Sequence, residues 1–262
     1  GTSLTMTAGT FRLGGSRVKP DISGTYSLSA GTTIEFTGTS ATQIRLAPQY
    51  ANVVISGTNV VAGTTNNGGL TFRTGGNFTV KNGARFKVNN DNGFSGGSTT
   101  AIKNTNSPAI TLETGSTIDY TGSDQTVTNI LPYQNLNIST IGTKTASSGD
   151  LVVNNLTTVS AGTLKFLKTA DNATPNVLYA HKGINNVGGS VIFENNAQLM
   201  QDEDANNTQA TIQSQRDVID MNNVSTQMDY VYWSSPVDGQ NIKAFSPNTP
   251  ANGYLQYNES ND

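Results

Sequence analysis

The sequence contains no cysteine, which excludes a disulfide framework and any chemistry that needs a thiolate. Charged residues are also scarce, at 13% of the chain, and the net charge of −3 comes without a basic run or an acidic tail. This charge distribution does not favour nucleic acid or an anionic membrane as a partner, so we expect no nucleic-acid binding. No apolar run approaches the ~20 residues that a membrane-spanning helix needs.

A leader segment and a thick apolar core are missing as well. No charged-then-apolar stretch opens the chain, so we expect any signal peptide to have been removed. The last residues, Tyr257–Asp262, are polar and form no closing element. We therefore expect the chain to be a piece of a longer protein. Hydrophobic residues make up only 34% of it, which suits a narrow core better than a thick globular one.

Short apolar-polar-apolar triplets recur along most of the sequence. Period two over three to five residues predicts short strands with one buried face. The connections are Gly, Asn, Ser and Thr in varied order. Representative triplets are Leu4/Met6, Phe11/Leu13, Ile44/Leu46, Val53/Ile55, Leu70/Phe72, Phe78/Val80, Phe86/Val88, Ile110/Leu112, Leu151/Val153 and Leu164/Phe166.

One phrase of the sequence occurs twice. Gly31–Gly38 is similar in sequence to Gly115–Gly122, 84 residues later, and Gln49–Ser56 is similar to Pro132–Ser139. Self-similarity on this scale indicates stacked supersecondary units. We therefore predict an all-β protein that is a right-handed parallel β-helix, a solenoid with ~20–30 residues in each coil.

An antiparallel sandwich also has regular short strands. Three features favour the β-helix: the long repeat keeps several strands in order, two-residue Asn-Gly hairpin turns are rare, and Thr, Ser and Asn flank the apolar positions at similar phases, as outer ladders would require.

Two segments interrupt the rhythm, and a third ends it. We expect residues 89–107 to be a long loop that leaves one coil, and residues 167–189 to be an irregular coil or a bulge. After residue 213 the pattern changes. We therefore predict β-helical repeats over residues 1–213 and the start of a truncated C-terminal junction or cap, a β-rich or sandwich region, over residues 214–262, because a solenoid end needs a cap.

Three runs of the later sequence carry a resemblance to a known family. Val191–Asp204, Met228–Val237 and Ala244–Thr249 resemble the junction in flavobacterial-type surface proteins of Bacteroidota, where β-helical repeats pass into a C-terminal region. In that family a type IX sorting domain usually follows. The resemblance implies a secreted protein on the outer-membrane surface of a Gram-negative bacterium. It also implies the type IX translocon and its cargo-handling proteins as partners, and adhesion or gliding as the role.

Parallel β-helices also include polysaccharide lyases and hydrolases, whose acids project from adjacent coils onto one outer face. The candidates are Glu35, Glu113, Asp119 and Asp124. Glu35 and Asp119 lie between the apolar residues of equivalent triplets, so both are expected to point outward, several coils apart. We interpret them as solvated surface carboxylates and predict no catalytic residue. A carbohydrate-active enzyme stays the alternative.

Asp202, Glu203 and Asp204 are weak candidates for a calcium site, since hard cations prefer several oxygen ligands. Their spacing matches no EF-hand loop, and a solvated acidic turn explains them as well, so we predict no cofactor. His181 is the only histidine, and without a second histidine or a cysteine it forms no zinc site. We expect it to be a surface or half-buried residue.

Aromatic residues gather near the end of the chain at Tyr230, Tyr232 and Trp233. Aromatic faces stack on sugar rings, which would suit a carbohydrate-binding module, but we favour packing where coil meets cap. Ser234 and Ser235 lack the Gly-x-Ser-x-Gly elbow of a nucleophilic serine.

The sequence therefore predicts a non-enzymatic structural or adhesive surface protein, a stiff β-helical stalk. Its surface ligand, a glycan or a protein, is not identified. The residues expected in the interior are Ile34, Phe36, Ile118, Tyr120, Leu136 and Ile138, and the glycines expected at turns are Gly31, Gly38, Gly115 and Gly122.

Overall fold

The computed structural model describes residues 3–62, 68–170, 174–202, 204–208 and 212–215. The chain divides into two compact units, Gly1–Arg216 and Asp217–Asp262, and only the first is described below. Its described residues form 21 strands and no helix. Apart from residues 214 and 215, the predicted C-terminal segment lies outside the described residues, so that boundary stays a prediction.

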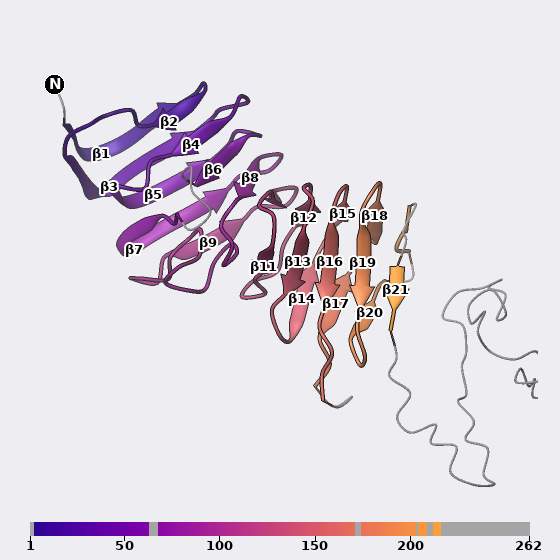
Figure 1. Ribbon diagram of the computed structural model, residues 1–262. Helices are drawn as coiled ribbons and strands as arrows, with labels where there is room; N and C mark the ends of the chain where they lie inside the picture. The colour runs from indigo at the N-terminus through magenta and orange to yellow at the C-terminus, as the bar shows by residue number, and fades with distance from the viewer. Residues whose placement is uncertain (1–2, 63–67, 171–173, 203, 209–211, 216–262) are drawn as a thin grey trace, which may run out of the picture. The chain divides into compact units, whose positions relative to one another are not determined.

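The strands form four parallel sheets, numbered I to IV here (Figure 1). Sheet I contains β1 (Leu4–Leu13), β3 (Tyr26–Phe36), β5 (Gln49–Ile55), β7 (Thr71–Val80) and β9 (Ala109–Leu112). Sheet II contains β2 (Arg17–Lys19), β4 (Thr42–Ile44), β6 (Val60–Ala62), β8 (Arg85–Val88), β10 (Thr117–Tyr120), β12 (Asn135–Ile138), β15 (Thr157–Val159) and β18 (Ile184–Asn186). Sheet III contains β11 (Gln125–Val127), β13 (Thr143–Ala146), β16 (Thr163–Phe166), β19 (Ser190–Phe193) and β21 (Ile212–Ser214). Sheet IV contains β14 (Asp150–Val153), β17 (Val177–Ala180) and β20 (Gln198–Met200).

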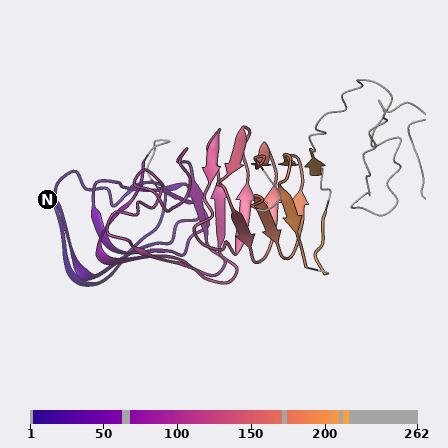
Figure 2. The ribbon, with the colours of Figure 1, turned by 90° about the horizontal axis from the view of Figure 1, so that it is seen from below.

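Neighbouring strands in a sheet belong to successive coils of one spiral. Ile118 on β10, for example, pairs with Phe86 on β8 and with Leu136 on β12. The chain passes through the other sheets between these positions, as the stack seen from below in Figure 2 also shows. The prediction of a parallel β-helix is confirmed. The antiparallel sandwich is excluded, because every strand pair is parallel.

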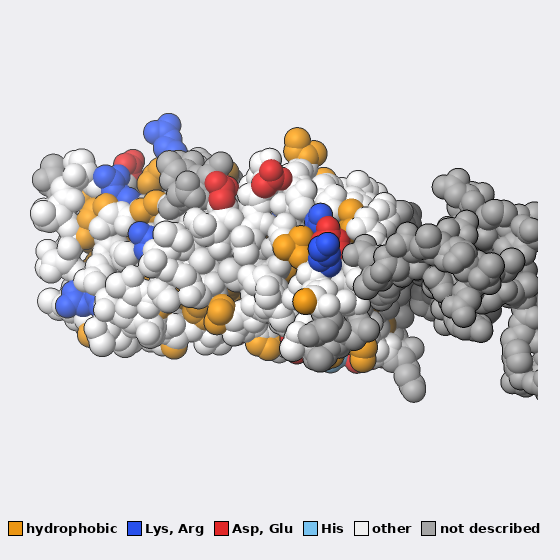
Figure 3. Space-filling view, turned by 60° about the horizontal axis from the view of Figure 1, so that its bottom comes forward, with side chains coloured by type: hydrophobic (Ala, Val, Ile, Leu, Met, Phe, Trp, Pro, Cys, Tyr) orange, Lys and Arg blue, Asp and Glu red, His pale blue; other side chains and the backbone are white. Residues whose placement is uncertain are grey.

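The interior is filled by most apolar members of the triplets, which point inward while the residue between them points outward. Phe11 in the first coil is an exception, at 39% exposure. All six side chains expected inside are at most 1% exposed. The surface that Figure 3 shows consists mainly of uncharged polar side chains and backbone, with few basic or acidic groups. A thin apolar centre under a Thr-, Ser- and Asn-rich exterior explains the low hydrophobic content.

The repeated phrase marks similar local structure on different sheets. Ile34 lies in sheet I, whereas Ile118, its counterpart in the repeat, lies in sheet II. The local packing is nevertheless reproduced. The buried hydroxyl of Tyr50 donates to the carbonyl of Arg45, and that of Tyr133 donates to the carbonyl of Thr128, five residues upstream in both cases.

Within the described residues, sheet II is the sheet that continues past the break between sheets I and III, from β2 to β18. Sheet I ends at β9 and sheet III begins at β11, and residues 89–107 fill the break between them. Phe94 from this segment is fully buried, and its ring lies 6.0 Å from that of Phe78 and 5.9 Å from that of Phe86. The expectation of a loop that leaves the coil is therefore wrong. The segment is an integral part of the core. Residues 167–189 are also more regular than expected, since they contain β17 and β18.

Glycines allow the turns between sheets II and III to stack closely. Gly162 has a φ of +68°, and a Cβ there would lie 2.4 Å from the carbonyl oxygen of Thr140 in the preceding coil. Gly31 was expected at a turn but lies inside β3, where a Cβ would have nothing within 4 Å. A glycine can therefore serve either a strained turn or an open strand position.

This contrast predicts opposite effects for two alanine substitutions. Gly162→Ala is expected to lower the free energy of unfolding by at least about 1–2 kcal/mol, because left-handed φ and the approach to Thr140 both disfavour a side chain. Gly31→Ala is expected to raise it by up to about 1 kcal/mol, because glycine weakens a strand interior. Urea unfolding of both variants measures the two changes, and equal changes would contradict the assignment of Gly162.

Candidate functional site

Six ion pairs lie among the described residues, and each joins one coil to the next. In every pair the basic residue belongs to the earlier coil and the acid to the later one. The pairs are Arg12–Glu35 (2.7 Å), Lys81–Glu113 (2.7 Å), Arg85–Asp119 (3.6 Å), Lys165–Glu194 (2.7 Å), His181–Asp202 (2.9 Å) and Lys182–Asp204 (2.9 Å). Exposed pairs contribute little each, about 0–1 kcal/mol. Because all six pairs join neighbouring coils in the same order, they indicate a role in holding successive coils together.

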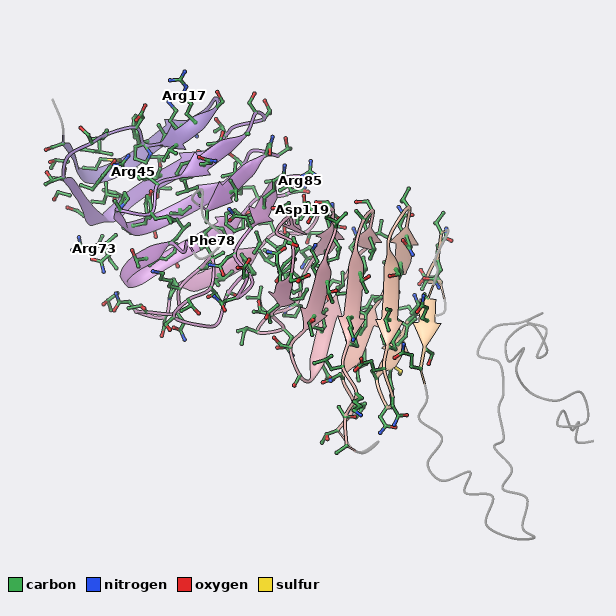
Figure 4. All side chains as sticks on the ribbon, in the orientation of Figure 1. Arg17, Arg45, Arg73, Phe78, Arg85 and Asp119 are labelled. Atoms are coloured by element: carbon green, nitrogen blue, oxygen red, sulfur yellow. The ribbon has the colours of Figure 1, made fainter. Side chains whose placement is uncertain are left out.

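Asp119 is the exception to the expected solvated carboxylates. Its side chain points to the outer face of sheet II, between Lys87 and Asn137 in the adjacent strands, yet the residue is only 1% exposed. The prediction of a solvated surface acid is wrong here, because side chains of neighbouring coils cover it. Figure 4 shows Arg85 and Asp119 together on this face.

The electrostatic setting of Asp119 disfavours its charge. Burial raises the pKa of Asp119, while the Ser139 hydroxyl and the positive charges of Arg85 and Lys87 act in the opposite direction. Its Oδ1 atom has no hydrogen-bond partner among the described residues. With 1% exposure the carboxyl does not reach a substrate, so we interpret it as a structural acid.

Asp119→Asn is expected to raise the thermal unfolding midpoint at pH 7. A folded-state pKa above the unfolded value of about 3.9 means that the folded protein binds more protons in the window between the two values. Wild-type stability therefore falls as the pH rises through that window, and the asparagine variant avoids this loss. Midpoints measured from pH 3 to pH 7 should converge at the acidic end. A variant that is less stable than wild type at pH 7 would contradict this account.

The other candidate acids are engaged separately and do not converge. Glu35 accepts hydrogen bonds from Arg12 and Ser56, and the Arg12 bond in particular lowers its pKa. Glu113 accepts from Lys81, which likewise lowers its pKa. The two repeat-equivalent acids, Glu35 and Asp119, lie on different sheets.

Asp124 lines a shallow groove where sheet III begins. The groove has a volume of about 390 Å³ and is lined by Asp91, Asp124, Gln125, Thr126, Thr143 and Thr145. Asp124 accepts a hydrogen bond of 2.7 Å from the backbone N–H of Thr143. Two carboxylates and three hydroxyls suit a polyhydroxylated ligand. Sequence reasoning considered Asp124 but not Asp91, which the inserted segment 89–107 brings to this position.

The two described calcium candidates face different basic partners. Asp202 faces His181 and Asp204 faces Lys182, while Glu203 lies outside the described residues. His181 is partly exposed, as expected. Within the described ranges no cluster of three or more histidine, cysteine or acidic side chains is placed to hold a metal ion. Tyr230, Tyr232, Trp233, Ser234 and Ser235 lie outside the described residues.

Lys144 is a buried lysine that sequence reasoning did not single out. It occupies an inward position of β13 and is fully buried. Its ammonium donates to the carbonyl oxygens of Thr140 and Ile141 at 2.8 and 2.6 Å. Burial lowers the pKa of Lys144, and Asp124 and Asp119 oppose this shift. The lysine therefore pins the turn between sheets II and III from inside.

Comparison with known proteins identifies a family for more than half of the chain. A family model described as a domain of unknown function, DUF8693, matches residues 124–262. Neither the curated proteins nor the solved structures contain a match. Within the described residues, no helix has the length and apolar character to cross a membrane.

Proposed function

The chain belongs to DUF8693, a family whose description assigns no activity, and we propose its function from its architecture. The protein is a non-enzymatic spacer and adhesive segment of a surface protein. The observation that carries the proposal is sheet II, which continues through eight strands across the break in the other sheets. A backbone ladder of this kind keeps successive coils in fixed register.

The charged groups support the same role. The described acids are mostly used in pairs between consecutive coils. Such pairs resist separation of the coils along the stack. A stiff stack with a low content of charged residues suits a segment that holds a binding surface away from the cell.

Export through the type IX pathway is the second part of the proposal. It is supported by the resemblance of Val191–Asp204, Met228–Val237 and Ala244–Thr249 to surface proteins of Bacteroidota. The partners during export are then the outer-membrane translocon and its cargo-handling proteins, and the final location is the cell surface or the medium.

Two measurements test these parts separately. Single-molecule pulling on the chain should give discrete force peaks as coils detach, and smooth extension without peaks would contradict the spacer. For export, protease accessibility on intact cells should detect the full-length gene product at the surface. The signal should disappear in a strain without the type IX translocon, and its persistence there would exclude this route.

The groove at Asp91 and Asp124 favours a second candidate, a carbohydrate-active enzyme, because two carboxylates line one hollow beside three threonine hydroxyls. Glycoside hydrolysis needs such a pair of acids. Incubation with acidic and neutral polysaccharides tests this alternative. Cleavage by the wild-type chain that is lost in Asp124→Asn would establish it and overturn the non-enzymatic proposal.

A further inference from the structure

The outer face of sheet IV carries an apolar row that crosses three coils. Val152 on β14, Tyr179 on β17 and Met200 on β20 are direct neighbours in the parallel register. Their sequence neighbours Leu178 and Ala180 are fully buried, so the row points away from the core, because alternate residues of a strand face opposite sides. The row is an aromatic ring flanked by two aliphatic side chains.

Tyr179 is available to a ligand. It is partly exposed, and Met200 beside it is 49% exposed. The buried tyrosines Tyr50 and Tyr133 each donate their hydroxyl to a backbone carbonyl. The hydroxyl of Tyr179, in contrast, has no hydrogen-bond partner within the described part of the chain. A ring with one free face and a free hydroxyl is suited to an amphipathic ligand.

Polar residues border this apolar row on one side and at both ends of the other side. Two residues after Tyr179 and Met200 come His181 and Asp202, joined by a hydrogen bond of 2.9 Å between Nδ1 and Oδ1. Because that bond uses Nδ1 and Oδ1, the Nε2 atom of His181 and the Oδ2 atom of Asp202 remain able to form hydrogen bonds with a ligand. Two residues before Val152, Tyr179 and Met200 come Asp150, Val177 and Gln198, which form another row of the same register. Val177 is buried, so hydrogen-bonding groups border the ring itself on the His181 side, whereas on the other side they lie beside the two ends of the apolar row.

We propose that this face of sheet IV binds a neutral polysaccharide whose chain runs along the solenoid axis. Successive coils repeat every 4.7–4.9 Å or so, which is close to the advance of one pyranose unit in an extended β-linked glycan. The C–H face of a sugar ring stacks on Tyr179. The hydroxyls of the sugar rings reach the His181–Asp202 pair on one side and Asp150 and Gln198 on the other.

Size and charge both favour a glycan over a protein partner. The apolar row is one side chain wide and spans three strands. Its area is therefore far smaller than the ~800 Å² that each partner of a stable protein interface buries. The border carries three acids, Asp150, Asp202 and Asp204, and among the described residues only Asp204 has a lysine partner, Lys182. This excess of acids disfavours an acidic polymer.

The proposal names the ligand class for the adhesive part of the proposed function and rests on that part, not on the spacer or on export. The test uses the full 262-residue chain in pull-down and calorimetry with cellulose, chitin, β-1,3-glucan and mannan, and with alginate as the acidic comparison. Tyr179→Ala is expected to lower affinity for the bound glycan at least about ten-fold, the equivalent of about 1.4 kcal/mol. Tyr179→Phe should retain most of it, since the stacking face remains.

Thr158→Ala, on the outer face of sheet II, is the matched control and should bind as wild type does. Circular dichroism verifies that each variant is folded. Absence of wild-type binding to every neutral glycan would overturn the proposal, as would equal binding by Tyr179→Ala or preference for alginate. Pulling experiments do not depend on Tyr179, so failure here leaves the spacer intact, whereas loss of force peaks removes the spacer alone.

Discussion

Replacing Phe94 by alanine is expected to lower the free energy of unfolding by about 3–5 kcal/mol, the range for a buried phenylalanine whose removal leaves a cavity. Phe94 lies at the break between sheets I and III. Its ring contacts Phe78 and Phe86 from the earlier coils and Tyr133 from a later one, at a centroid distance of 6.2 Å from the last. Without this ring, the two halves of the solenoid are joined mainly through sheet II.

Chemical unfolding followed by circular dichroism measures this effect. Phe11→Ala is the matched control, because Phe11 is 39% exposed in the first coil and its loss should cost much less. If sheets I and III become separate units, the Phe94→Ala transition should also split in two. Equal losses for the two variants would show that the inserted segment 89–107 is peripheral to the core.

The triplet pattern was sufficient to predict the strands and the inward residues, because a strand alternates sides every residue. The same pattern does not say which sheet a strand joins. Ile34 and Ile118 share one phrase of sequence, yet the number of residues in the intervening coils places them in sheets I and II. Pairing depends on coil length, and coil length varies wherever a segment such as 89–107 is inserted.

The sequence pattern also did not predict which outward-facing side chains are buried. Glu35 and Asp119 occupy equivalent positions, but Asp119 is nearly inaccessible while Glu35 is partly exposed. The difference arises from the adjacent coils, where Lys87 and Asn137 flank Asp119. A local pattern contains no information about residues 18 to 32 positions away that become neighbours in space.

The candidate binding face was missed for a related reason. Val152, Tyr179 and Met200 are 27 and 21 positions apart, and only the parallel register brings them into one row. Sequence reasoning placed the aromatic candidates at Tyr230, Tyr232 and Trp233, where aromatics cluster along the chain. In a solenoid, however, a surface site is assembled across coils, so equivalent phases in successive coils indicate it better than local clusters do.

Ile118→Asp is expected to destabilise the protein by several kcal/mol at neutral pH, because an unpaired charge would be placed in an apolar interior. Ile118 is fully buried on β10, between Phe86 and Leu136. This part of sheet II is the ladder that continues where sheet I ends and sheet III begins. A defect here therefore acts at the point where the other sheets offer least support.

Two comparisons separate the charge from the mere change of residue. Ile118→Val should cost only about 0.5–1.5 kcal/mol. Ile141→Asp, at a turn position that is 77% exposed, should stay within about 0.5 kcal/mol of wild type.

The pH dependence of the lost stability gives a further test. Burial raises the pKa of the new carboxyl, so the deficit of Ile118→Asp should shrink as the pH falls and the acid becomes neutral. Urea unfolding at pH 4 and pH 7 measures the free energy of unfolding of each variant. If Ile118→Asp loses no more stability than Ile141→Asp at both pH values, Ile118 does not lie in the core and sheet II is not the continuous ladder.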